Sequence, residues 1–278
     1  MKNKSLIILL ITLLSIIVIV LTIFMINVLN GNFNIKNLNF FTNVSNELVV
    51  DEVYDNTFNK IDIRANAGDI YIKESLNNEV KVIVYGDKNR TSVSVGDNEL
   101  LIESKIKSCV GICFNRKMAK IELYLPSDNE GSIEIKNNYG DIDIDSFKNM
   151  DINIDEDCGD IEILNANKVD IKQSAGDIEI GEVTDIIVKN NLGETKIEKV
   201  NNYLNIKSDC GDVEIDSVNL QKDSYIKNDL GDIEIGSTNE IFINASTDLG
   251  SLEIKNNFNK AETTLKIEND CGDIEVNN

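Results

Sequence analysis

The sequence predicts an all-β fold in which one N-terminal transmembrane helix is followed by a single-chain parallel β-solenoid, that is, a β-helix. Three observations support it: a long uncharged apolar stretch near the N-terminus, short runs of alternating aliphatic and polar residues, and a Gly-Asp-Ile phrase that recurs at a regular interval. Such an interval is the signature of a repeat architecture. We expect a right-handed coil, because β-crossover connections are usually right-handed.

The apolar stretch covers residues 6–29 and is almost entirely Leu, Ile and Val. A helix of that length spans about 36 Å, enough for the roughly 30 Å hydrocarbon core of a membrane. A cleaved signal peptide is the alternative, but no Ala-x-Ala-like site precedes Asn30. Lys2 and Lys4 precede the stretch and only Lys36 closely follows it, so the positive-inside rule places the N-terminus in the cytoplasm.

The pattern changes twice after this stretch. Residues 30–46 are rich in Asn and show no clear period, and from Glu47 onward the chain alternates like half-buried strands at 60–64, 80–84, 100–103 and 120–125. The predicted segments are a cytoplasmic N-terminus (1–5), a transmembrane anchor (6–29), a stalk (30–46), an N-terminal β region of the solenoid with long loops (47–130) and regular β-solenoid repeats (131–278).

Each repeat contains a glycine that we interpret as a structural corner, because glycine supplies backbone angles closed to other residues. These glycines are Gly68, Gly140, Gly159, Gly176, Gly193, Gly211, Gly231, Gly250 and Gly272. A second strand precedes each corner, as in Ile152-Asn153-Ile154. One strand–corner–strand unit cannot bury its apolar face alone, whereas stacked units form a continuous aliphatic ladder. An antiparallel sandwich would not repeat the same corner so regularly.

The chain resembles the bacterial putative-adhesin family of membrane-anchored β-solenoid proteins, a family of the domain-of-unknown-function type. The Gly-Asp-Ile-x-Ile repeats after Gly131, the strand that ends at Pro126 and the anchor carry the resemblance. It covers most of residues 47–278. The resemblance implies a cell-surface role and is nearly silent on activity.

Acidic residues follow the corner glycines and would stack in columns. The first column is Asp141, Asp160, Asp177, Glu194, Asp212 and Asp232, and the second, two residues on, is Asp143, Glu162, Glu179, Glu214 and Glu234. Opposed like charges destabilise a sheet, so something should offset them. We expect hydrogen bonds from corner N–H groups and a basic column four residues before the glycines, made of Arg64, Lys136, Lys172, Lys189, Lys207 and Lys227. Calcium is the alternative, although the Gly-Gly-x-Gly-x-Asp pattern of calcium-binding rolls is absent, and we predict no cofactor.

Composition excludes several functions. Lys2, Lys4 and Lys36 are the only charged residues before Glu47, so the 27 basic and 48 acidic residues of the chain leave a net charge of −24 on residues 47–278. Such a surface repels nucleic acid. The chain has no His and no Trp, which removes His-based catalysis and His-ligated zinc. Paired carboxylates could serve glycoside hydrolysis, but the acids here are regular, and we predict no enzyme activity.

The five cysteines fall into two groups. Cys109 and Cys113 flank a short loop segment, and outside the cell a local disulfide between them is one reading. Cys158, Cys210 and Cys271 each precede a corner glycine where other repeats carry Ala, Leu or Tyr. We expect this position to point inward, because buried Cys behaves as a small hydrophobe.

We therefore predict a single-pass cell-membrane protein whose bulk is extracytoplasmic, acting as a cell-surface scaffold or adhesin-like interaction module. An envelope-stress accessory or sensor with a membrane regulatory partner is the alternative. Expected partners are the membrane through residues 6–29, a cell-wall polymer or protein ligand, and a second copy end to end, because Val276 leaves the last turn uncapped. The Ile-, Leu- and Asn-rich composition and the family resemblance indicate a Gram-positive bacterium.

Overall fold

The computed structural model describes residues 41–105 and 116–277 of the 278-residue chain. These residues form strands and loops without an α-helix, so the all-β prediction is confirmed. The predicted anchor at 6–29 and most of the stalk lie outside the described residues. Within the described ranges, no helix is long and apolar enough to cross a membrane. The repeats belong to a compact unit of Val44–Ser108 and Lys117–Asn278, whereas β1 (Phe41–Val44) falls mainly in a second unit.

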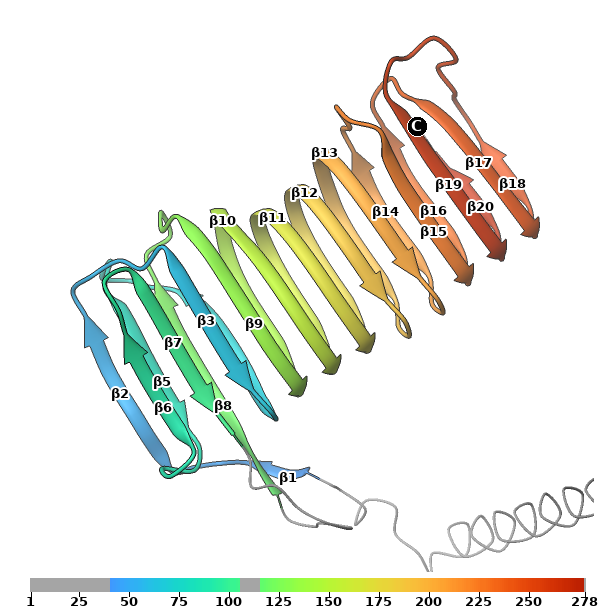
Figure 1. Cartoon of the computed structure of the whole chain (residues 1–278). Coiled ribbons are helices and arrows are strands. Elements are labelled where there is room, and N and C mark those ends of the chain that lie inside the picture. The colour runs from blue at the N-terminus through green and yellow to red at the C-terminus, as the bar shows by residue number, and fades with distance from the viewer. Residues whose placement is uncertain (1–40, 106–115, 278) are drawn as a thin grey trace, which may run out of the picture. The chain divides into compact units, whose positions relative to one another are not determined.

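The repeats coil into stacked turns joined by parallel strand pairs (Figure 1). Each turn consists of a strand, a glycine corner, a second strand and a bend that leads to the next turn. Four long strands pass through the bend without interruption: β10 (Ile142–Cys158), β11 (Ile161–Ala175), β12 (Ile178–Asn190) and β13 (Thr195–Ser208). Their first halves lie after a corner and their second halves lie before the next one. The predicted strand–corner–strand unit is therefore present.

We call the strands before the corners the first sheet and those after the corners the second sheet. In order of pairing, the first sheet contains β6 (Thr91–Val95), β7 (Glu99–Ser104), β3 (Lys60–Ala65), β9 (Gly131–Tyr139), the second halves of β10–β13, β15 (Ser224–Leu230), β19 (Thr264–Cys271) and β17 (Phe242–Leu249). The second sheet contains β2 (Leu48–Tyr54), β5 (Val80–Tyr85), β8 (Arg116–Leu125), β4 (Gly68–Glu74), the first halves of β10–β13, β14 (Val213–Val218), β16 (Ile233–Thr238), β20 (Ile274–Val276) and β18 (Leu252–Ile254).

Aliphatic side chains fill the space between the two sheets. Ile144, Ile163, Ile180 and Ile197 follow one another at equivalent positions of β10–β13, and each is fully buried. Their neighbours in sequence point outward, as the period of two along a strand requires. Burying one such side chain contributes about 1.5–3 kcal/mol. The continuous aliphatic ladder predicted from the repeat is therefore the core of the protein.

At the N-terminal end, the stack does not follow the order of the chain. The turn formed by β7 and β8 packs outside the earlier turn of β3 and β4. Antiparallel pairing then closes this outer turn: β6 pairs with β7, β5 pairs with β8, and β2 pairs with the outer side of β5. Reversing the strand direction ends the parallel stack and covers its edges, which are otherwise templates for association.

The order is also inverted at the C-terminal end (Figure 1). The last turn in sequence, β19 and β20, pairs on one side with β15 and β16 and on the other with β17 and β18. The expectation that Val276 leaves the final turn at the open end is therefore wrong, because that turn is inserted one place inside the stack. The outermost strand β17 is capped by Asn257, whose side chain accepts from Ile243 N (2.9 Å) and donates to Ile243 O (2.8 Å).

Candidate interaction surface

The predicted corner glycines stack on one another at one edge of the sheets. Gly176 has φ +136°, a conformation that residues with a Cβ rarely adopt, and a Cβ added there would overlap the carbonyl oxygen of Gly159 in the adjacent turn. The other corners with positive φ are Gly140, Gly159, Gly193, Gly211, Gly231 and Gly272. Gly68 and Gly250 occupy the same column near the two ends of the stack without a positive φ. The edge is therefore built from closely stacked backbone.

The corner aspartates form a hydrogen-bonded ladder along this edge. The backbone N–H of Asp177 donates to Asp160 Oδ1 (2.9 Å), and the N–H of Asp232 donates to Asp212 Oδ1 (2.8 Å). The same bond joins Asp141 to Asp69, Asp160 to Asp141, Glu194 to Asp177, Asp273 to Asp232 and Ser251 to Asp273. For Asp273, this N–H from Ser251 lowers the carboxyl pKa, because it stabilises the ionised form.

The basic column lies four residues before the corners, on the first sheet, and three of its side chains, Arg64, Lys136 and Lys227, pair with nearby acids. Arg64 bonds to Asp62, and Lys136 Nζ lies 2.6 Å from Glu134, in each case within one strand. Lys227 Nζ lies 2.7 Å from Asp229 and 3.8 Å from Asp270. Exposed pairs such as Lys136–Glu134 contribute about 0–1 kcal/mol each.

Sequence reasoning missed a second ladder, made of buried polar side chains three residues before the corners. Asn137 Nδ2 donates to Gly68 O (3.0 Å), and Asn228 Nδ2 donates to Gly211 O (3.0 Å). Gln173, Asn190, Thr247 and Asn269 each donate to the corner carbonyl of the adjacent turn in the same way. These side chains, amides except for the hydroxyl of the partly buried Thr247, satisfy carbonyls that the corner would leave buried without a partner. The ladder could have been found in the sequence from the polar residue three positions before the corner glycine, where strand alternation predicts an inward side chain.

Glu156 occupies this amide position in its own turn and is 2% exposed. Burial raises its carboxyl pKa to about 8, against a hydrogen bond of 3.2 Å from Asn137 Nδ2 that favours the charged form. Asp141, Asp160 and Asp157 add repulsion in the same direction as burial. At pH 7 the carboxyl group of Glu156 is therefore mostly protonated.

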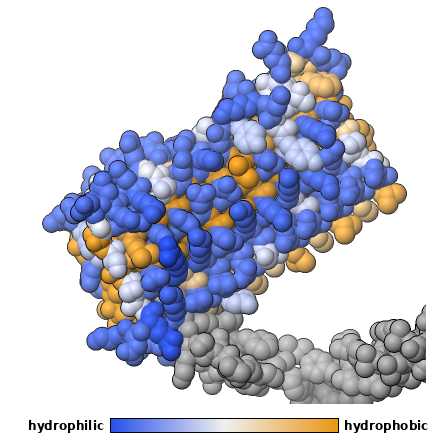
Figure 2. Space-filling model, in the orientation of Figure 1, coloured by the Kyte–Doolittle hydropathy of each residue, from blue (hydrophilic) through white to orange (hydrophobic). Residues whose placement is uncertain are grey.

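From Gly140 onward, the residue immediately before each corner glycine is at least partly exposed, which corrects the prediction that Cys158, Cys210 and Cys271 point inward. Before Gly68, Ala67 is buried. Cys158 and Cys210 are exposed, and Cys271 is partly exposed. In order along the stack, the residues at this position are Tyr139, Cys158, Ala175, Leu192, Cys210, Leu230, Cys271 and Leu249, which we call the corner stripe. Leu192 is 58% exposed, Leu230 52% and Leu249 71%. Hydrophobic residues follow the lower edge of the molecule in Figure 2, where strands of the first sheet end in Figure 1.

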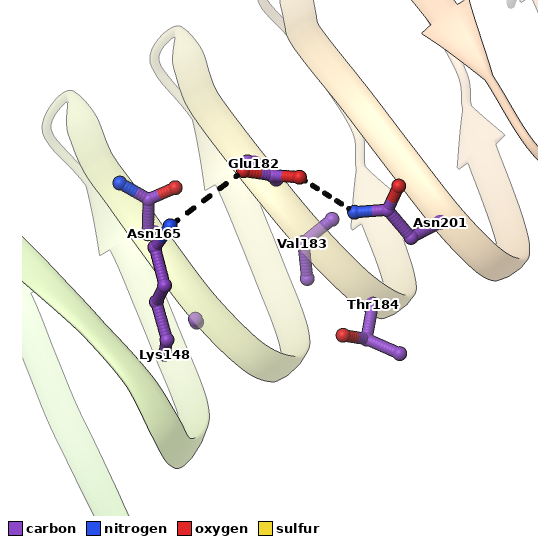
Figure 3. Close-up of a pocket in the computed structure, with 7 residues that line it drawn as sticks. Lys148, Asn165, Glu182, Val183, Thr184 and Asn201 are labelled. Atoms are coloured by element: carbon purple, nitrogen blue, oxygen red, sulfur yellow. Dashed lines mark hydrogen bonds and ion pairs between the residues drawn. The ribbon is translucent and has the colours of Figure 1, made fainter.

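A polar hollow of about 130 Å³ lies on the opposite side of the turns, near the bends (Figure 3). Its central group is Glu182, which accepts from Asn201 Nδ2 (2.9 Å) and Lys199 Nζ (3.0 Å) and lies 3.9 Å from Lys148 Nζ. The Asn201 hydrogen bond, followed by the bond from Lys199, lowers the Glu182 pKa. Because Glu182 already bonds to Asn201 and Lys199 and lies close to Lys148, we assign no ligand to this hollow.

Cys109 and Cys113, for which a local disulfide is one reading of the sequence, lie outside the described residues. Two repeats depart from the Gly-Asp-Ile phrase, at Gly193-Glu194-Thr195 and at Gly250-Ser251-Leu252. Thr195, in the irregular copy Gly193-Glu194-Thr195, is completely buried where other turns carry Ile or Val, and its hydroxyl has no hydrogen-bond partner among the described residues. Gly250 and Leu252 belong to the outermost turn, and Leu252 is 46% exposed.

These features define a class of protein: an all-β repeat stack that presents one column of acidic side chains and one of mainly apolar side chains along a single edge. A family model described as Toastrack DUF4097 matches residues 58–278, and the chain belongs to this family, whose fold is β-solenoid-like. The resemblance to a putative-adhesin, domain-of-unknown-function family is confirmed.

Similar solved structures come from bacteria. One, described as a putative adhesin from Bacteroides fragilis, has a TM-score of 0.48 and 18% identity, covering 84% of this chain and 99% of its own. A second, described as a putative lipid binding protein from Parabacteroides distasonis, has a TM-score of 0.49 and 13% identity, covering 84% of this chain and 98% of its own. A search of the curated proteins finds no match to this chain.

Proposed function

We propose that the protein is a non-enzymatic interaction module of the cell envelope, anchored to the membrane by residues 6–29, that binds its partner along the side of the stack. The observation that supports this proposal is the exposed corner stripe. Soluble surfaces rarely expose contiguous apolar residues, and those that do usually mark an interaction site. Here the exposed side chains recur in successive turns, so they form one continuous line rather than scattered single residues.

The regular acids support a binding role rather than a catalytic one. A glycoside hydrolase needs two carboxylates with separate roles, one of them held as an acid. From Asp141 to Asp232, the corner aspartates instead share one hydrogen-bonding pattern, in which each accepts a backbone N–H from the next turn. Carboxylates in equal environments have no reason to divide into an acid and a base.

Site-directed photo-crosslinking in intact cells tests the proposal. A photoreactive residue is placed at Leu192 on the corner stripe, and a matched control at Leu164, which is 46% exposed on the second sheet. We expect a discrete, stoichiometric adduct from Leu192 and none from Leu164. Equal adducts from both positions, or turnover of a glycan by the purified protein that is lost when the acids of one turn are changed, would contradict the proposal. An adduct with an integral membrane regulator would assign the protein the role of a sensor.

A further inference from the structure

The corner stripe has a distinct electrostatic setting in its C-terminal half. Leu192, Cys210, Leu230, Cys271 and Leu249 occupy five successive turns. The residues flanking these positions on both sides are mostly acidic: Asp209, Asp229, Asp270 and Asp248 lie before the stripe, and Glu194, Asp212, Asp232 and Asp273 lie after it. Lys227 is paired with two of these acids. The C-terminal half of the corner stripe is therefore an apolar line between two rows of negatively charged residues.

A partner cannot bind this line by adding a strand. The stripe runs across the strands, and its backbone carbonyls already accept hydrogen bonds from corner glycines: Gly211 N–H donates to Leu230 O (2.8 Å) and Gly272 N–H to Leu249 O (2.8 Å). Contact must therefore come from side chains, and the partner must satisfy its own backbone hydrogen bonds. An α-helix does so within one segment.

The spacing along the stripe also suits a helix. Parallel strands lie about 4.8 Å apart, so successive stripe residues repeat at nearly the 5.4 Å pitch of an α-helix. An apolar helix face can therefore lie along five turns, a length of about 19 Å, with roughly one apolar contact per helical turn. Lys or Arg on both borders of that face would meet the two acidic rows.

Other occupants fit less well. Two copies joined stripe to stripe would bring the acidic rows of both molecules together, and an anionic membrane surface would meet the same repulsion. From the contacts and charges above, we propose that the C-terminal half of the corner stripe docks a cationic amphipathic α-helix of a peptide or protein partner. This inference deepens the proposed function and rests on it.

The test uses the full chain in zwitterionic nanodiscs and a fluorescent helix of about 18 residues, with Leu on one face and Lys on its borders. Anisotropy measures binding. A peptide of the same composition in scrambled order, without an apolar face, is the control ligand. We expect saturable binding of the amphipathic peptide, weakening as salt rises because the charges are exposed, and markedly weaker binding of the scrambled peptide.

Two matched variants locate the site. L192N/L230N/L249N removes the exposed leucines of the stripe, and we expect about tenfold or greater loss of affinity. L76N/L164N removes two exposed leucines elsewhere and should bind like the parent, since Leu76 is 100% exposed and Leu164 46% exposed. Melting temperatures show whether each variant folds. D209N/D229N should weaken binding and flatten its salt dependence.

Four results would overturn the proposal: no binding of the amphipathic peptide, equal binding of the scrambled peptide, equal affinity of the stripe and control variants, or loss of self-association in the stripe variant. The last would make a second copy the occupant. If the stripe still crosslinks a partner in cells while the cationic helix does not bind, the interaction module stands and only the helical partner is wrong.

Discussion

Asn137 and Glu156 occupy equivalent positions in adjacent turns, and the amide nitrogen of Asn137 lies 3.2 Å from the carboxyl oxygen Oε1 of Glu156. An amide can donate to the corner carbonyl of the neighbouring turn, whereas an ionised carboxylate cannot. Glu156 therefore fits this ladder best as a neutral acid, in agreement with its raised pKa of about 8.

The first prediction is that Glu156→Gln stabilises the protein in a pH-dependent way. From the ordinary value of 4.5 up to about 8, the unfolded state releases a proton that the folded state keeps, so this group makes stability fall as pH rises. The slope is at most about 1.4 kcal/mol per pH unit. Denaturant unfolding at several pH values should show the variant and parent alike near pH 4 and diverging towards pH 8. The exposed control Glu253→Gln should show no such divergence, and a pH-independent gain for Glu156→Gln would contradict the assignment.

The second prediction concerns the corner backbone. Gly176→Ala combines an unfavourable φ of +136° with overlap against the Gly159 carbonyl, and we expect a loss of about 2–4 kcal/mol in unfolding free energy. Gly96→Ala is the control, because an added Cβ there would have its nearest neighbours at 3.8 Å, an ordinary contact. Denaturant unfolding checks both variants, and equal stability of the two would show that the corner tolerates a side chain.

The third prediction uses the unpartnered hydroxyl of Thr195. Replacing it with Val keeps the shape of the side chain and removes a buried group without a hydrogen bond, so Thr195→Val should stabilise the protein by about 1–2 kcal/mol. Thr184→Val, at a partly exposed position near the bend, should change stability by less than about 0.5 kcal/mol. A loss of stability for Thr195→Val in thermal unfolding would mean that the hydroxyl has a partner, such as a bound water.

The fourth prediction follows from the outward position of the cysteines. Cys158 and Cys210 should react with a maleimide in the folded protein at nearly the rate seen in denaturant, and Cys271 more slowly, since it is only partly exposed. Peptide mapping by mass spectrometry identifies each labelled site. A Val188→Cys variant supplies a buried thiol for comparison, because Val188 is 1% exposed. Labelling of Cys158 and Cys210 only after unfolding would restore the inward assignment.

The strands and corners could be predicted from the sequence because every turn has the same geometry and needs the same residue types at equivalent positions. The core needs an aliphatic side chain at Ile161, Ile178 and Val213. The corner needs glycine at Gly159 and Gly176, because a Cβ there would overlap with the neighbouring turn. The period alone does not state which turns are neighbours. Residues 242–254 and 264–276 carry similar patterns, so either could sit outermost, and the pairing of β17 and β18 with the last turn was not foreseen.

The corner stripe was misread for a different physical reason. Counting by two from Ile226 predicts that Asn228 and Leu230 both point inward, whereas the structure buries the polar residue and exposes the apolar one. Asn228 is needed inside to bond to the corner carbonyl of Gly211, and the chain has turned away from the core by Leu230. Alternation is reliable within a strand, but it fails at its end, where backbone groups need partners.

The inverted order at the C-terminal end has a consequence for biosynthesis. β17 and β18 are made before β19 and β20, yet their partners in the stack are those later strands. Docking each new turn onto the previous one therefore cannot build this end, because β17 and β18 have no strand partner in the stack until β19 and β20 have been made. A chain truncated before Thr264 would leave β17 and β18 without the strands that join them to the stack.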